Sequence, residues 1–179
     1  MGYSTPFTAV AGTAWKAADW NVYGRDNIAW IATDSPACRA YNSAAISVAT
    51  GTDVFLTFNS ERFDNASVHS TVSNTGRLTV PTGGGGKYII GSNIDFATTF
   101  AGVLRASGLR LNGSTFIADQ YSPPTNSAFS SGRFTVTSIY SLSAADYVEV
   151  RAYQDSGGAL NVTATGNYSP EFWCFWFRN

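Results

Sequence analysis

From Ala37 to Asn179, short apolar runs alternate with clusters of Gly, Asn, Ser and Pro. The apolar runs are rich in β-branched and aromatic residues, which is typical of strands in an all-β protein. About ten strands at this spacing predict an all-β, ten-stranded sandwich. We expect the strands at residues 38–48, 53–59, 63–69, 77–80, 87–97, 101–106, 109–120, 133–142, 146–153, 159–164 and 171–177.

Two of these strands show which of their faces is buried. Side chains alternate across a strand, so a half-buried strand is apolar on one parity and polar on the other. Residues 146–153 place Val148, Val150 and Ala152 on one parity. Residues 133–142 set an apolar parity of Phe134, Val136, Tyr140 and Leu142 against a polar parity of Arg133, Thr135, Thr137 and Ser141.

The last predicted strand, residues 171–177, is apolar on both parities. One face can join the core of the sandwich. The other face needs cover from a neighbouring subunit or from the N-terminal segment, because an exposed apolar patch of this size is rare on a monomer. We therefore expect an oligomer interface formed by the aromatic residues of this strand, which are Phe172, Trp173, Phe175, Trp176 and Phe177.

Residues 17–31 form the one predicted helix, because aromatic and apolar residues recur there at spacings of three and four. Asp34-Ser35-Pro36 ends it. These aromatic and apolar residues form a stripe along one face of the helix. The stripe either packs on the chain's own sandwich or anchors the chain to another protein or to another copy of the chain. A sandwich of this size needs no such stripe for its core, so we favour an N-terminal anchor segment, residues 1–36, ahead of a head domain, residues 37–179. The anchor residues are Trp20, Tyr23, Trp30 and Ile31.

Charged residues make up 13% of the chain, and its formal net charge is −1. No basic block is present, so the electrostatic footprint of a nucleic-acid binder is missing. No apolar run approaches the roughly 20 residues that cross a bilayer. Residues 1–6 lack the basic start and the apolar stretch of a signal peptide. We therefore expect no nucleic-acid partner, no membrane insertion, and folding in a reducing cytoplasm.

Candidate catalytic and metal-binding groups are sparse. His69 is the only histidine and no nucleophile elbow, G-x-S-x-G, accompanies it, so we expect it at the surface or at an interface. Gly83–Gly86 precedes Lys87, but a strand follows instead of the helix of a phosphate-binding loop. The two cysteines, Cys38 and Cys174, are too few for a zinc site. The sequence predicts no catalytic residue, no metal and no cofactor, and hence a protein that is not an enzyme.

Four stretches resemble the head domain of the complement C1q and tumour-necrosis-factor (TNF) superfamily: Val54–Asn59, Phe63–Asn65, Gly86–Ile90 and Asp146–Val150. The resemblance covers about residues 37–177. It implies a jelly-roll sandwich that forms a homotrimer and buries aromatic residues near the threefold axis. It also implies that the first and last strands pair, with Cys38 and Cys174 on neighbouring strands. We expect free thiols there, because a reducing cytoplasm keeps thiols reduced.

The N-terminal part resembles the leader of tailed-bacteriophage structural proteins in three stretches: Tyr3–Gly12, Ala17–Asn21 and Arg25–Ile28. In those proteins a short helix precedes a β-sandwich. The two resemblances together imply a structural virion protein, tail-associated or a capsid decoration, with a trimeric head displayed on the particle surface. Its partners would be itself and, through residues 1–36, other virion proteins. Its location would be the virion, assembled in the host cytoplasm.

Two alternatives stay open. The first is a receptor-binding adhesin that recognises a host-surface glycan or protein, with Tyr121, Tyr153 and Tyr168 as ligand-facing aromatics. Tyrosine rings suit stacking on sugars, although ordinary sandwich packing also accounts for them. The second is an enzyme that degrades the host envelope, for which the sequence offers no catalytic constellation.

Overall fold

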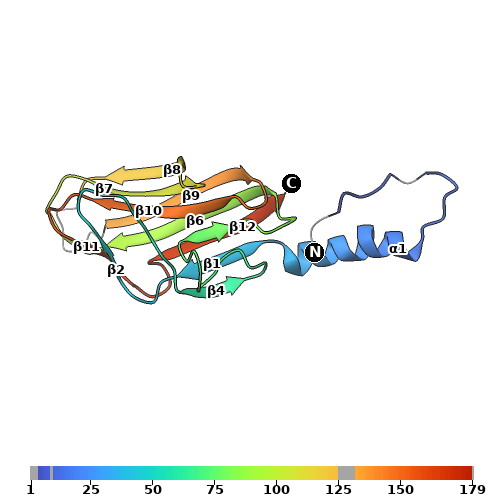
Figure 1. The fold of residues 1–179 in the computed structure, drawn as a ribbon, viewed down its shortest axis with the longest axis horizontal. Coiled ribbons are helices and arrows are strands. Elements are labelled where there is room, and N and C mark those ends of the chain that lie inside the picture. The colour runs from blue at the N-terminus through green and yellow to red at the C-terminus, as the bar shows by residue number, and fades with distance from the viewer. Residues whose placement is uncertain (1–3, 9, 125–131, 179) are drawn as a thin grey trace.

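The computed structural model describes residues 4–8, 10–124 and 132–178. An N-terminal arm, which comprises the described residues up to Pro36, projects from one end of a two-layered β-sandwich, which we call the head (Figure 1). The arm contains a helical run that lies along the long axis of the molecule, with the preceding chain folded back beside it.

The helical run extends from Ala17 to Asp34. It comprises α1 (Ala17–Asp19), the π-helical η1 (Trp20–Arg25), α2 (Asp26–Ala29) and the π-helical η2 (Trp30–Asp34). It is three residues longer than the predicted helix and ends at Ser35, whose backbone is extended with ψ 134°. Residues before proline disfavour the helical conformation, and Pro36 follows. Among the described residues, no helix is long and apolar enough to cross a membrane.

The first sheet is built around β6 (Gly86–Phe96). One edge of β6 pairs along its length with β9 (Gly132–Leu142), and the other edge pairs with β12 (Glu171–Arg178) and then with β11 (Leu160–Val162). β12 continues to β1 (Ala37–Tyr41) and β4 (Ser60–Asp64), while β11 pairs with β2 (Ile46–Val48). The second sheet contains β3 (Val54–Phe55), β5 (Arg77–Thr79), β10 (Tyr147–Gln154), β7 (Arg105–Leu111) and β8 (Thr115–Ser122).

The bounds of several strands differ from the predicted ones where side-chain oxygens accept hydrogen bonds from backbone N–H groups. A backbone N–H that bonds a nearby side chain is lost to the strand ladder. Predicted strand 63–69 gives way to β4 because the Asp64 carboxylate accepts the N–H groups of Ala66, Val68 and His69. Predicted strand 101–106 is largely loop because Asp155 accepts those of residues 103 and 104. The predicted strand 38–48 divides into β1 and β2 around an Asn42 turn.

The core lies between the two sheets and confirms the predicted facing of β10, whose Val148, Val150 and Ala152 are buried. In β9, Phe134, Val136 and Leu142 are buried, whereas Tyr140 of the same parity is 37% exposed. Burying each of the larger side chains contributes about 1.5–3 kcal/mol.

Candidate functional site

The outward face of the first sheet carries an apolar cluster that the chain itself leaves uncovered. Phe175 and Ile139 are 49% and 67% exposed, and the strand register places Ile89 between them. Phe63, from β4, is also 49% exposed. Large apolar residues on adjoining strands form the kind of patch that marks a contact surface. We call this cluster the aromatic face, and it consists of Phe63, Ile89, Ile139, Trp173, Phe175 and Phe177.

Trp173 lies flat on this face because β6 has a glycine opposite it. A Cβ atom at Gly91 would lie 2.2 Å from the Trp173 ring, so only glycine leaves room for the indole. A hollow of about 430 Å³ beside the indole is bordered by Phe63 and Phe175. The aromatic face therefore offers a shallow depression that a protruding apolar group of another subunit would fit.

Two of the predicted interface residues serve the chain's own packing. Phe172 is fully buried and contacts Phe58, with ring centroids 5.4 Å apart, so its assignment to an intersubunit interface is wrong. Trp176 is half-buried and meets Trp30 edge to face at 4.5 Å. The even-numbered parity of β12 faces the core, which leaves Trp173, Phe175 and Phe177 as the outward-facing residues of the prediction.

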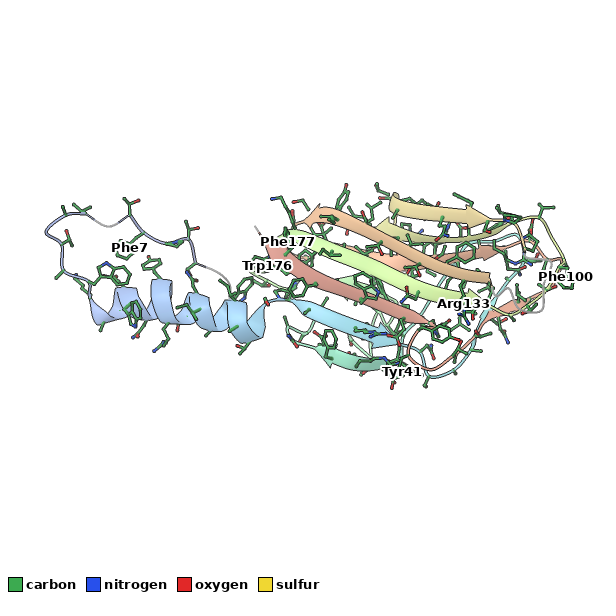
Figure 2. All side chains as sticks on the ribbon, turned by 180° about the vertical axis from the view of Figure 1, so that it is seen from behind. Phe7, Tyr41, Phe100, Arg133, Trp176 and Phe177 are labelled. Carbon is green, nitrogen blue, oxygen red and sulfur yellow. The ribbon has the colours of Figure 1, made fainter. Side chains whose placement is uncertain are left out.

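Charged groups adjoin the aromatic face on the same sheet, and the register places Arg39 between Phe63 and Trp173. Glu171 is 1% exposed and accepts hydrogen bonds from Arg39 Nε and Arg62 Nε, both at 2.8 Å. The same arginines donate to the carbonyls of Asn167 and Gly166. A buried carboxylate keeps its charge only with such compensation. In Figure 2, Phe177 lies at the arm end of the head and Arg133 toward the opposite end.

The outward face of the second sheet, by contrast, is closed by its own ion pairs. Glu149 bonds Arg77 at 3.1 Å and Arg110 at 2.9 Å, and Arg151 holds Asp119 with both bonds under 3 Å. The guanidinium groups also cover aromatic rings, the closest being Arg110 over a phenylalanine of β3, at 3.2 Å. Contacts of this kind satisfy both the charges and the ring faces. The first sheet therefore presents the more open surface.

The three predicted ligand-facing tyrosines do not converge on one site. Tyr121 and Tyr153 lie on the second sheet, on either side of Ala106 in the register. Tyr121 is 59% exposed, and its hydroxyl donates to Asp119 at 2.6 Å. Tyr168 lies beside Arg133 at the end of the first sheet. A single stacking site cannot use all three rings.

His69 is a buried structural residue, so the prediction that it lies at the surface or an interface is wrong. Its side chain has no exposed area. Nδ1 lies 2.8 Å from Glu61 Oε1, and Nε2 lies 3.0 Å from the carbonyl oxygen of Thr75. Both ring nitrogens are occupied, so neither is available to activate a nucleophile. Across the described residues, no group of three or more His, Cys, Asp or Glu side chains is arranged to hold a metal ion.

We expect His69→Ala to lower the free energy of unfolding by about 1–3 kcal/mol, because it removes the hydrogen bonds of the buried ring to Glu61 and to the Thr75 carbonyl. Urea denaturation measures the change, and Thr71→Ala, at an exposed position of the same loop, should leave stability within about 0.5 kcal/mol. Assembly should be unaffected, since the buried His69 side chain is not part of the aromatic face. An unchanged stability for His69→Ala would contradict this structural role.

Cys38 and Cys174 stand directly opposite each other on β1 and β12, which confirms the prediction that they lie on neighbouring strands. Both are free thiols in the core. Burial, followed by the charge of Asp64, raises the pKa of Cys174 to about 12 and raises the pKa of Cys38 as well. Because the thiolate is the nucleophile and the metal ligand, these thiols are poorly suited to either role near neutral pH.

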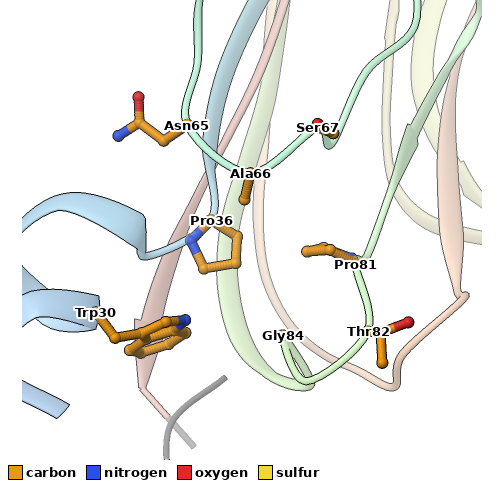
Figure 3. Close-up of a pocket in the computed structure, with 8 residues that line it drawn as sticks. All are labelled: Trp30, Pro36, Asn65, Ala66, Ser67, Pro81, Thr82 and Gly84. Atoms are coloured by element: carbon orange, nitrogen blue, oxygen red, sulfur yellow. The ribbon is translucent and has the colours of Figure 1, made fainter. Parts of the chain in front are cut away.

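A second hollow, of about 410 Å³, lies where the arm meets the head (Figure 3). Trp30 and Pro36 border it from the arm side, facing Ala66 and Pro81 of the head loops. Trp30 is only 3% exposed, so its assignment as an anchor to another protein is wrong: it fixes the arm to the chain's own head through Trp176.

The other predicted anchor residues divide between inward and outward positions. Tyr23 packs on Phe7 of the returning chain, with ring centroids 5.1 Å apart. Trp20 and Ile31 are 54% and 56% exposed. Ile28, which the sequence analysis did not select, is 63% exposed. The arm thus presents uncovered apolar groups even after its own packing.

Sequence reasoning also missed Phe63, Ile89 and Ile139, which come from three different strands. Ile139 carried a usable signal, because it is an apolar residue on the otherwise polar parity of residues 133–142. Phe63 and Ile89 gave no such signal, since their place beside β12 depends on strand order.

No protein-family model matches the sequence, and no curated protein does. Solved structures do match. The globular domain of zebrafish complement 1qA protein is 15% identical, with a TM-score of 0.51, over 80% of this chain and 99% of that one. The Eiger TNF of S. frugiperda is 14% identical, with a TM-score of 0.53, over 80% and 94%. Murine APRIL is 10% identical, with a TM-score of 0.57, over 79% and 98%.

The head has the C1q/TNF-like jelly-roll fold. At these identities the likeness concerns the fold alone. It confirms the all-β sandwich with one short N-terminal helix. In the C1q/TNF-like head, the aromatic face lies on the sheet that contains both the first strand, β1, and the last, β12.

Proposed function

We propose that this chain is a homotrimeric structural protein of a tailed-bacteriophage particle, either tail-associated or a capsid decoration. The observation that supports self-association is the aromatic face. Its exposed residues come from four strands of one sheet, whereas ion pairs cover the outward face of the second sheet. Subunit interfaces are more apolar than the remaining surface of a protein, which fits this face.

In this proposal the arm attaches the trimer to the particle. Trp20, Ile28 and Ile31 stay exposed on the helical run, and Trp30 fixes that run to the head. A rigid arm with uncovered apolar groups suits docking into another structural protein. The resemblance of the N-terminal part to phage structural proteins supports the assignment of the chain to a phage particle. Among the residues that the structure describes, neither the head nor the arm supplies a catalytic group, so we also infer that the protein is not an enzyme.

We expect the double variant Trp20→Ser, Ile31→Ser to be incorporated into particles at least tenfold less than the natural chain, which corresponds to about 1.4 kcal/mol or more of lost binding. Quantitative mass spectrometry of purified particles measures incorporation. Val72→Ser, at a 91% exposed position on a head loop, is the control and should be incorporated normally. Normal incorporation of the double variant, with the trimer intact by light scattering, would show that the arm is not the attachment.

A receptor-binding adhesin is the second candidate. It is supported by Tyr121, an exposed ring whose orientation is fixed by Asp119. Glycan-array binding by the intact chain that Tyr121→Leu abolishes would favour the adhesin.

A further inference from the structure

We propose that the hollow beside Tyr168, at the charged end of the first sheet, binds a neutral saccharide. The inference rests on the proposed function in one respect: copies of the chain cover the aromatic face, whose hollow Asn93 also borders, and leave the Tyr168 side of that residue open. The hollow measures about 210 Å³ and is lined by Asn93, Ile94, Arg133, Phe134, Thr135 and Tyr168.

Tyr168 supplies the apolar surface of the site. Its side chain is 39% exposed and contacts Arg133 in two ways. The guanidinium lies 4.8 Å from the ring centroid, and Arg133 Nη2 donates to the tyrosine hydroxyl at 3.1 Å. A fixed aromatic ring loses little conformational freedom when a sugar ring packs on it.

Two polar side chains beside Tyr168 have unused hydrogen-bonding capacity. Asn93 and Thr135 are partners in the β6–β9 register, and both point outward, away from the buried Ile94 and Phe134. Neither side chain forms a hydrogen bond with any residue that the structure describes. The amide offers donors and an acceptor, and the hydroxyl offers both. Adjacent sugar hydroxyls are donors and acceptors at a comparable spacing.

The charges of the site point to a neutral ligand. Arg133 Nε donates to Asp95 Oδ2 at 3.3 Å, so the positive charge of the guanidinium and the negative charge of the carboxylate offset each other. The Asp95 side chain is 8% exposed, and its Oδ1 has no partner within the described part of the chain. A buried carboxylate oxygen without a donor is costly.

Isothermal titration of the intact chain tests the site with D-glucose, D-galactose, N-acetyl-D-glucosamine and lactose, and with D-glucuronic acid as the acidic comparison. We expect at least one neutral sugar to bind with a Kd of about 1 mM, as is usual for a small site with few contacts. Asn93→Ala, Thr135→Val and Tyr168→Leu should each weaken binding about tenfold. Phe116→Leu, at a 40% exposed position on the other sheet, is the control and should bind as the natural chain does.

Thr135→Val keeps the shape of an exposed side chain and replaces its hydroxyl by a methyl group, so we expect the fold to be unchanged, which circular dichroism checks. Three outcomes overturn the proposal: no neutral sugar binds, only the acidic sugar binds, or binding survives all three substitutions. Light scattering of the same samples separates this site from the proposed function. Lost sugar binding by an intact trimer supports the site, whereas a monomer that binds sugar normally contradicts the trimer and leaves the site standing.

Discussion

Replacing Glu171 with alanine should lower the free energy of unfolding of the head by about 3 kcal/mol. Glu171 is 1% exposed and links Arg39 of β1 and Arg62 of β4 to the last strand. Its removal leaves two arginines facing each other without a counter-charge and frees the carbonyls of Gly166 and Asn167 from a fixed partner. Breaking a buried ion pair by removing one partner is far more costly than losing a surface pair.

Urea denaturation followed by tryptophan fluorescence measures this loss. Asp53→Ala is the matched control, because Asp53 is 41% exposed and its arginine partner, Arg151, keeps Asp119. That control should cost no more than about 1 kcal/mol. Equal losses for the two variants would show that the Glu171 network adds no more than a surface ion pair.

The double variant Phe175→Asp, Ile139→Asp should convert the trimer to a folded monomer. Both side chains are about half exposed or more in the single chain, so the substitutions leave the core intact. Within an assembled interface the same positions would hold two unpaired carboxylates per subunit. An uncompensated buried charge costs several kcal/mol, and each 1.4 kcal/mol shifts the dissociation constant tenfold.

Light scattering and circular dichroism of the purified variant check this expectation together. Val103→Asp is the control: it places one such carboxylate at a 76% exposed position outside the aromatic face and should stay trimeric. If the double variant keeps the natural oligomeric state, the aromatic face is not the subunit contact.

The sequence predicted those features that depend on local pattern. Alternation along residues 146–153 located the buried parity of β10, and the apolar character of both faces of residues 171–177 identified β12 as a strand in need of cover. The same pattern could not say which parity of β12 faces the core. Phe172 was therefore assigned to the interface, although it packs on Phe58.

Features that depend on tertiary contacts escaped prediction. His69 lies among serine and valine in the sequence, and only the fold places Glu61 and Thr75 against its ring. Trp30 belongs to the apolar stripe that the sequence pattern places on the surface of the helix, yet the junction with the head buries its side chain. The three tyrosines suggested a shared ligand site from their positions near strand ends. Tyr121 and Tyr153 lie on strands of the second sheet, whereas Tyr168 lies in the turn before β12.

The mass of the intact chain in solution tests the central claim most directly. Multi-angle light scattering at micromolar concentration should give three times the subunit mass of 19.1 kDa. The aromatic face would then be buried between copies of the chain. A mass of one subunit across the micromolar range would contradict the account, because the aromatic face would then stay open to water.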